Sequence, residues 1–117
     1  MKIDLRLMNT IKFEVQGSLP DPYIVTFVLN EKNLNAFCTC AAGEKGQVCK
    51  HRLNILMGVT DCIVSDNSHQ VSEVCKWSQG TDVEHALSKV IDAENELKLV
   101  QEKVKLAKKN LGIAMRK

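Results

Sequence analysis

Residues 38–51 of this 117-residue chain read CTCAAGEKGQVCKH. The stretch holds two pairs of potential metal ligands, and eight small or polar residues separate the pairs. Cysteine sulfur and histidine nitrogen are the ligands that zinc prefers, and zinc takes four of them at the corners of a tetrahedron. The pattern therefore predicts one zinc ion, bound by Cys38, Cys40, Cys49 and His51.

The residues that flank the ligands predict how such a site is built. Residues 34–40 (LNAFCTC) favour a strand, in which Cys38 and Cys40 would share one face because side chains repeat every two residues. Residues 48–58 (VCKHRLNILMG) change to a helical period, with Leu53, Leu56 and Met57 on one face and Gly58 as terminator. Cys49 is then expected in the turn before this helix, and His51 in its first turn.

The loop between the pairs carries Gly43 and Gly46, which let it fold back and close the site. The helix N-terminus and Lys50 are expected to favour the thiolate forms that zinc requires. Four protein ligands leave no open corner, so the site is predicted to be structural rather than catalytic.

Three alternatives stay open for these cysteines: burial as ordinary core residues, a disulfide between Cys38 and Cys49, and a catalytic cysteine–histidine pair. Five cysteines are an odd number, and the start MKIDLRLMNT has no apolar core of a secretory signal. We therefore expect an intracellular protein of the cytoplasm or nucleus, not secreted, in which a disulfide is disfavoured. No apolar run approaches the length of a membrane span.

The chain before the ligands predicts a small antiparallel sheet. Residues 2–7 and 11–16 alternate between apolar and polar side chains, which is typical of half-buried strands. Residues 17–22 (GSLPDP) are a loop, and residues 23–30 (YIVTFVLN) are apolar on both faces, as in a central strand. The predicted fold class is α+β: a small antiparallel sheet with a zinc-binding ββα unit, followed by a long C-terminal helix.

Residues 59–80 are harder to interpret. A short helix over 69–79, ending at Gly80, is one possibility. Cys62 and Cys75 match no ligand spacing and are expected to be buried free thiols. Trp77, the only tryptophan, is expected to cover the core near the start of the last helix, and His85 to face solvent.

A long amphipathic helix is predicted from Thr81 to the end of the chain. Residues 81–84 (TDVE) form a capping box, in which Thr81 and Glu84 satisfy each other's end of the first turn. Apolar residues then recur at alternating steps of three and four, as in a coiled coil. The members of this seam are Val83, Ala86, Val90, Ala93, Leu97, Val100, Val104, Ala107, Leu111 and Ala114.

A helix of about 45 Å or more is longer than the diameter of a globule of 80 residues, which is only about 30 Å. An apolar seam that extends beyond the globule would be exposed to water unless a partner covered it. The simplest partner is the same helix of a second copy of the chain, so we expect a homodimer. The domains are then 1–80, a zinc-binding domain with its metal unit at 23–58, and 81–117, a dimerisation or partner-binding helix.

Charge is distributed unevenly along the chain. Residues 101–117 contain six basic residues and one acid, giving +5, so a chain of net charge +2 carries −3 in residues 1–100. The candidate phosphate contacts are Lys45, Lys50 and Arg52 beside the metal site and Lys108 and Lys109 in the tail. The alternative is that lysines suit a helix C-terminus and keep it solvated.

The motif CTC…CKH resembles the CxC…CxH pattern of SWIM-type zinc fingers. Residues 23–58 also resemble that family's ββα unit, including the step from CKH into an apolar helix. The resemblance implies zinc on Cys38, Cys40, Cys49 and His51. It also implies binding of DNA or protein partners, since SWIM modules occur in chromatin-remodelling ATPases, transposase-related proteins, recombination factors and ubiquitin ligases.

The function expected from the sequence is a non-enzymatic zinc-binding interaction module, an adaptor or regulator that acts as a homodimer. The alternative is a nucleic-acid-binding regulatory protein that uses the finger and the basic tail. An enzyme is not expected, because the chain has no recognisable acid/base pair, phosphate-cradling loop or open metal position. We expect neither a small-molecule substrate nor a membrane partner.

Overall fold

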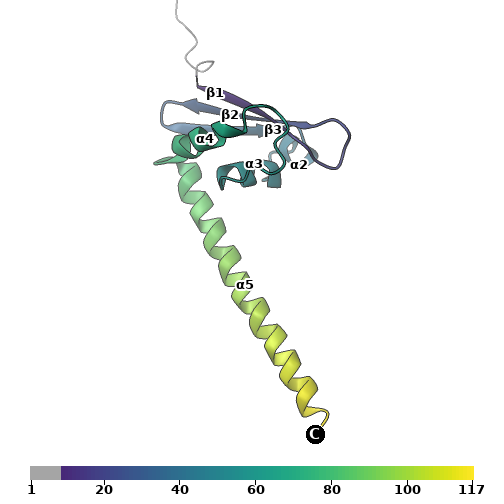
Figure 1. Ribbon diagram of the computed structural model, residues 1–117. Coiled ribbons are helices and arrows are strands. Elements are labelled where there is room, and N and C mark those ends of the chain that lie inside the picture. Colours follow the sequence, from purple (N-terminus) through teal and green to yellow (C-terminus); the bar gives the residue numbers. More distant parts are fainter. Residues whose placement is uncertain (1–8) are drawn as a thin grey trace, which may run out of the picture. The chain divides into compact units, whose positions relative to one another are not determined.

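A computed structural model describes residues 9–117 of the chain. Its sheet consists of β1 (Thr10–Val15), β2 (Tyr23–Asn30) and β3 (Asn33–Cys38), all antiparallel, in the order β1-β2-β3 (Figure 1). The prediction that β2 is the central strand is confirmed. The strand predicted at residues 2–7 lies outside the described residues.

The strand register places the large apolar side chains on one face of the sheet. Phe13 pairs with Val25, and Val25 pairs with Cys38 on the other side. Phe27, two residues along β2, packs its ring edge-on to Phe13 with the ring centroids 6.1 Å apart. Because strand side chains alternate between faces, this pairing gathers the core on one side and brings Cys38 into it.

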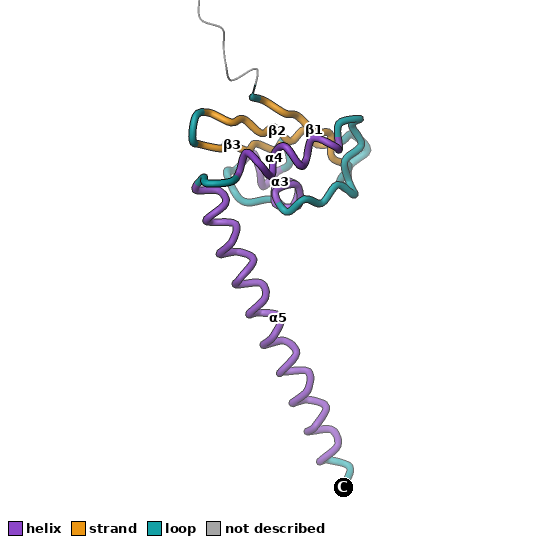
Figure 2. Tube along the Cα trace, turned by 60° about the vertical axis from the view of Figure 1, so that its left-hand side comes forward, coloured by secondary structure: helices purple, strands orange, loops and turns teal. Residues whose placement is uncertain are grey.

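Helices cover this apolar face. Figures 1 and 2 show α3 (Lys50–Leu56) and α4 (Val71–Ser78) on the same side of the sheet. Ile55 of α3 and Val71 and Val74 of α4 are buried there. The helix predicted after the metal ligands is confirmed, although its buried residue is Ile55, whereas Met57 is 41% exposed. Gly58 ends the helix with φ +87°, a conformation that favours glycine.

The segment between α3 and α4 runs along the outer edge of β1. Val64 donates its N–H to the carbonyl of Glu14, and Gln16 donates to the carbonyl of Cys62. Farther along, the Ser65 hydroxyl accepts from the Glu14 N–H (3.0 Å). The segment thus satisfies backbone groups that an open sheet edge would leave unpaired. A short 3₁₀ turn, η1 (Ser68–Gln70), leads into α4.

The two cysteines outside the predicted metal site differ in their burial. Cys62 is exposed, so the prediction that it is buried was wrong. Its segment is hydrogen-bonded to the outer edge of the sheet and does not enter the core. Cys75 is half-buried on α4, and its thiol contacts the carbonyls of Ile55 and Leu56 at 3.7 and 3.6 Å. Burial raises the pKa of the Cys75 thiol. Trp77 packs against the core, as predicted.

The last helix, α5 (Asp82–Ala114), has 33 residues. Only half of the predicted capping box forms at its start, because the Glu84 carboxylate binds the N–H of Gly80 while the N–H of Thr81 donates to the carbonyl of Ser78. Thr81 Oγ1 accepts from the N–H of Glu84 (3.4 Å), and the Glu84 carboxylate accepts from the N–H of Gly80 (3.0 Å). The chain divides into two compact units, Met1–Glu84 and His85–Lys117. His85 is exposed, as predicted. No helix within residues 9–117 is long and apolar enough to cross a bilayer.

Candidate metal centre

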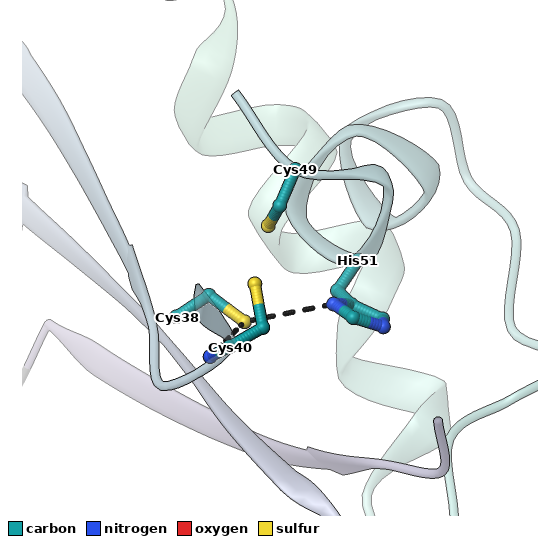
Figure 3. Close-up of side chains that lie close together, drawn as sticks. All are labelled: Cys38, Cys40, Cys49 and His51. Carbon is teal, nitrogen blue, oxygen red and sulfur yellow. Dashed lines mark hydrogen bonds between the residues drawn. The ribbon is translucent and has the colours of Figure 1, made fainter. Parts of the chain in front are cut away.

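Four side chains converge between the end of β3 and the start of α3 (Figure 3). The ligand atoms of Cys38, Cys40, Cys49 and His51 all lie within 4.8 Å of one another. The three cysteines are buried and free of disulfides, and His51 is partly buried. The structure therefore brings together the four residues that the CxC…CxH spacing predicted.

The first ligand pair lies at a junction between a strand and a short helix. β3 ends at Cys38, and Cys40 is the N-cap of α2 (Ala41–Glu44). The predicted strand through Cys40 was therefore wrong by two residues, because the sulfur of Cys40 accepts the N–H of Gly43 (3.3 Å) and starts a helical turn. That turn, rather than the alternation of a strand, brings the two sulfurs to one side.

The second ligand pair lies at the start of α3, as predicted. Cys49 is the N-cap with extended backbone angles (φ −118°, ψ 154°), and His51 is in the first turn. Arg52 follows in the same turn and points back into the site. Its guanidinium donates from Nε to Cys49 Sγ (3.3 Å), from Nη1 to the carbonyl of Ala36 (3.0 Å), and from Nη2 to the carbonyl of Gln47.

Each sulfur of the cluster accepts one N–H group. Cys38 Sγ accepts from the N–H of Cys40 (3.5 Å), Cys40 Sγ from that of Gly43, and Cys49 Sγ from the guanidinium of Arg52. Hydrogen bonds of this kind favour the charged thiolate over the thiol, because the N–H dipole points at the negative charge. These hydrogen bonds offset part of the cost of burying the deprotonated sulfurs that a metal ion needs.

The pKa values differ among the ligands in the absence of metal. Burial raises the pKa of the Cys38 thiol to about 12. Burial acts in the same direction on Cys49 and is the largest single effect there, but hydrogen bonds from Arg52, together with those from Cys40 and Cys38, outweigh it and lower the pKa of that thiol. Burial, followed by the charge of Lys50, lowers the pKa of His51, so its imidazole is neutral and able to ligate at pH 7. Arg52, rather than the predicted Lys50, therefore favours the thiolate.

The ring of His51 is held from its far side. The Tyr23 ring packs against it with centroids 4.9 Å apart, and a Cβ on Gly17 would lie 3.5 Å from His51 Nε2 and 2.3 Å from Tyr23 Cε2. The Tyr23 ring therefore leaves no space for a side chain at position 17, and only glycine fits there. The sequence showed Gly17 only as part of a loop, and nothing in its pattern connected it to the histidine.

Gly43 has a steric role in the turn between the ligand pairs. A Cβ at this position would lie 2.4 Å from the carbonyl oxygen of Cys38, which is far inside van der Waals contact. Gly46, in contrast, has open space around it but a φ of +76°, which favours glycine. The prediction that both glycines let the segment fold back is borne out, by two different constraints.

The cluster fits zinc by its donor set and its spacing. Zn–S bonds of about 2.3 Å and Zn–N bonds of about 2.0 Å at tetrahedral angles place sulfur and nitrogen about 3.5 Å apart. Cys38 Sγ and His51 Nδ1 lie 3.7 Å apart, so Nδ1 is the nitrogen that faces the sulfurs (Figure 3). Three thiolates, one imidazole and no carboxylate are a combination that zinc prefers.

The comparison with protein families agrees with this geometry. The family model of the SWIM zinc finger matches residues 13–56. These residues form a SWIM zinc finger. The match begins at Phe13 in β1, ten residues before the unit that the sequence motif suggested, and ends at Leu56, where α3 ends. No curated protein and no solved structure matches the chain.

The SWIM finger binds one structural zinc ion through its four ligands. Around the finger, Lys45 and Lys50 are exposed, whereas Arg52 is turned inward to Cys49 and two carbonyls. The guanidinium of Arg52, which was predicted as a phosphate contact, thus lies against a metal ligand and two backbone carbonyls. Lys108 and Lys109 are exposed on α5.

One nitrogen of the site is left without a partner. His51 Nε2 is buried and has no hydrogen-bond partner among the described residues. With Nδ1 bound to zinc, Nε2 carries the ring proton, and histidine ligands commonly donate this proton to a second group. Here the packing of Tyr23, rather than a hydrogen bond, orients the ring.

Proposed function

We propose that this protein is a non-enzymatic interaction module, an intracellular adaptor or regulator that works as a homodimer. The SWIM finger supplies a rigid, zinc-stabilised unit, and α5 supplies the surface that pairs. The observation that carries the proposal is the apolar seam of α5, in which Val90, Leu97, Val100, Val104 and Leu111 are 38–59% exposed. Apolar side chains at this spacing favour association with another helix.

The metal site supports a scaffold rather than a catalyst. Zinc in catalytic sites keeps one position for water or substrate, whereas Cys38, Cys40, Cys49 and His51 fill all four positions of a tetrahedron. Binding energy of a structural zinc ion is folding energy in a small domain, because the unfolded chain has no preformed site. In this proposal the metal stabilises the fold that presents α5 and the surface of the finger.

One residue of the predicted seam has another role. Val83 packs against the core of the zinc unit, next to the capping box. The proposed pairing surface therefore begins beyond it, at Ala86, and continues to Ala114.

Analytical ultracentrifugation of the zinc-loaded chain tests the homodimer. We expect a dimer at micromolar concentration, and a monomer when residues 97–117 are deleted. A chain that sediments as a monomer at several hundred micromolar would refute the proposal.

Nucleic-acid binding is the second candidate function. It is favoured by the charge of +5 on residues 101–117 and by the exposed Lys45 and Lys50 on the finger. A salt series separates the two candidates. Phosphate contacts make the affinity for a DNA or RNA duplex fall steeply between 50 and 200 mM salt, roughly in proportion to the number of phosphates neutralised. Association through an apolar seam responds weakly to the same change.

A further inference from the structure

The side chains along the seam of α5 alternate in size. In heptad notation the larger residues occupy the a positions, and small residues occupy four of the five d positions. The a residues are Val83, Val90, Leu97, Val104 and Leu111, and the d residues are Ala86, Ala93, Val100, Ala107 and Ala114. Two helices pack well when a large side chain meets a small one across the interface.

The two possible orientations of a helix pair treat this alternation differently. In a parallel pair, each a residue faces the same a residue, and each d residue faces the same d residue. Layers of paired valines or paired leucines would then alternate with layers of paired alanines, except at Val100. The larger layers would hold the helices apart and leave voids at the alanines, which costs stability.

In an antiparallel pair, a positions face d positions. With the helices fully overlapped, Val90 meets the partner's Ala107, Val104 meets the partner's Ala93, and Leu111 meets the partner's Ala86. At the centre, Leu97 meets the partner's Val100. Each of these layers occurs twice because of the two-fold symmetry. The large residues thus face small ones in every layer except the central one, and the spacing of the helices stays even.

The charge of α5 reverses along its length. Residues 82–100 contain five acids and two bases, a net charge of −3, and residues 101–117 carry +5. Antiparallel pairing places the acidic half of one helix beside the basic half of the other. Parallel pairing places like charge beside like charge, which is unfavourable.

The residues that flank the seam also select the orientation and the register. In the fully overlapped antiparallel pair, Glu96 lies opposite the partner's Lys103, twice by symmetry. A shift by one heptad in either direction would place Lys103 opposite the partner's Lys103, or Glu96 opposite the partner's Glu96. In the parallel pair, Lys103 would lie opposite the partner's Lys108. Flanking charges of this kind decide partner and orientation in coiled coils.

The other exposed apolar residues of α5 do not form a competing seam. Leu99, Leu106 and Ile113 recur every seven residues on another face of the helix, and Ile91 is followed three and four positions later by Glu94 and Asn95. The positions three and four residues after Leu99 and Leu106 are polar, so this row has one apolar residue per heptad instead of two.

We propose that α5 pairs antiparallel with α5 of a second copy, in the register that places Glu96 against the partner's Lys103. The inference rests on the proposed function, because it gives the orientation of the homodimer proposed above. The two SWIM fingers, each joined to the start of its own α5, then attach at opposite ends of a helix pair about 50 Å long. The dimer would present its two fingers to two separate partners or to two distant points on one partner.

Lys103→Glu distinguishes the orientations by the sign of its effect. In the antiparallel pair the new carboxylate faces the partner's Glu96, so we expect the dimer dissociation constant to rise on the order of fivefold or more. In the parallel pair it would face the partner's Lys108, and the dimer would tighten. Lys109→Glu is the matched control, because it makes the same charge change on the side of α5 opposite the seam.

Glu96→Lys should weaken the antiparallel dimer as well, and an equimolar mixture of the two single variants should form a heterodimer as tight as the wild type. Sedimentation equilibrium of the zinc-loaded full chain at 50 mM salt measures all four proteins. Tighter dimers of Lys103→Glu, a trimer or tetramer, or dimers that none of the variants changes would each overturn the antiparallel register. A wild-type chain that stays monomeric would instead overturn the homodimer itself.

Discussion

The SWIM finger and α5 are stabilised in different ways. In the finger, Phe13, Val25 and Phe27 are fully buried, and strands distant in sequence pack against helices that follow them. In α5, every side chain from Ser88 to Leu111 is exposed, and the backbone hydrogen bonds of the helix are all local. The finger therefore depends on tertiary contacts and a metal ion, whereas α5 depends on its helix propensity and on what its seam binds.

Because the two regions are stabilised differently, a perturbation of one region should leave the other unchanged. Loss of zinc should act on the finger, and loss of the seam should act on association. Each of the following experiments changes one region, and a response in the other region would contradict the separation.

The largest effect is expected from Cys49→Ser. This substitution removes a ligand whose metal contributes on the order of 10 kcal/mol, as much as the whole stability of a small domain. We expect the finger to lose its near-ultraviolet circular dichroism and its cooperative thermal transition, as it should after treatment with a strong chelator. Cys62→Ser, at an exposed cysteine outside the cluster, is the control and should leave both unchanged. A fully cooperative unfolding transition in metal-free protein would contradict the role given to zinc.

Deletion of residues 97–117 should have the second largest effect, and only on association. It removes Leu97, Val100, Val104 and Leu111 from the seam, so we expect the dissociation constant of the dimer to rise at least 100-fold, while the melting temperature of the zinc-loaded finger at high dilution changes by less than about 2 °C. Deletion of residues 115–117, which follow α5, is the matched control. Unfolding of the finger in the larger deletion would show that the two regions are coupled.

Gly43→Ala should weaken zinc binding more than Gly46→Ala does. The new Cβ at position 43 would collide with the Cys38 carbonyl and push apart the first ligand pair, at a cost of about 2–4 kcal/mol. At position 46 the cost is the left-handed backbone alone, about 1–2 kcal/mol. Competition with a chromophoric chelator measures both zinc affinities, and equal losses would refute the steric role of Gly43.

Arg52→Gln is expected to have the smallest effect, and one that depends on pH. Without the guanidinium the pKa of Cys49 rises, so protons compete with zinc more strongly at pH 7 and the zinc affinity falls by about tenfold. The deficit should shrink as the pH rises, because the thiol then ionises without help. Lys45→Gln, at an exposed cation between the two ligand pairs, is the control. A deficit that is the same at all pH values would mean that Arg52 acts through packing alone.

Much of the fold could be predicted because its signals are local. The alternation over Ile11, Phe13 and Val15 marks a strand, the apolar run at 23–30 marks the central strand, and TDVE marks the start of α5. Each of these patterns reflects the period of a single element, and a period does not depend on the rest of the chain. The four zinc ligands could be predicted for the same reason, since their spacing is itself the signal.

The features that were missed all depend on contacts between distant residues. The strand prediction through Cys40 failed because the Gly43 N–H reaches the Cys40 sulfur and turns the chain. The burial of Cys62 was wrong because residues 62–65 are hydrogen-bonded to the edge of β1 instead of entering the core. The inward turn of Arg52 was missed as well, since a sequence does not show that its guanidinium binds the carbonyl of Ala36, sixteen residues away.

By itself, then, the sequence determined the zinc ligands, the order of strands and helices, and the amphipathic last helix with its alternation of large and small seam residues and its reversal of charge, because each of these is encoded in the order of residues along the chain. Only the tertiary structure decided which groups surround the ligands. The Tyr23 ring packs on the imidazole of His51, and Gly17 leaves room for that ring. Arg52 favours the thiolate of Cys49, and Gly43 leaves room for the carbonyl of Cys38. These roles depend on short distances between particular atoms of the folded chain, and the periodicity of a sequence does not specify such distances.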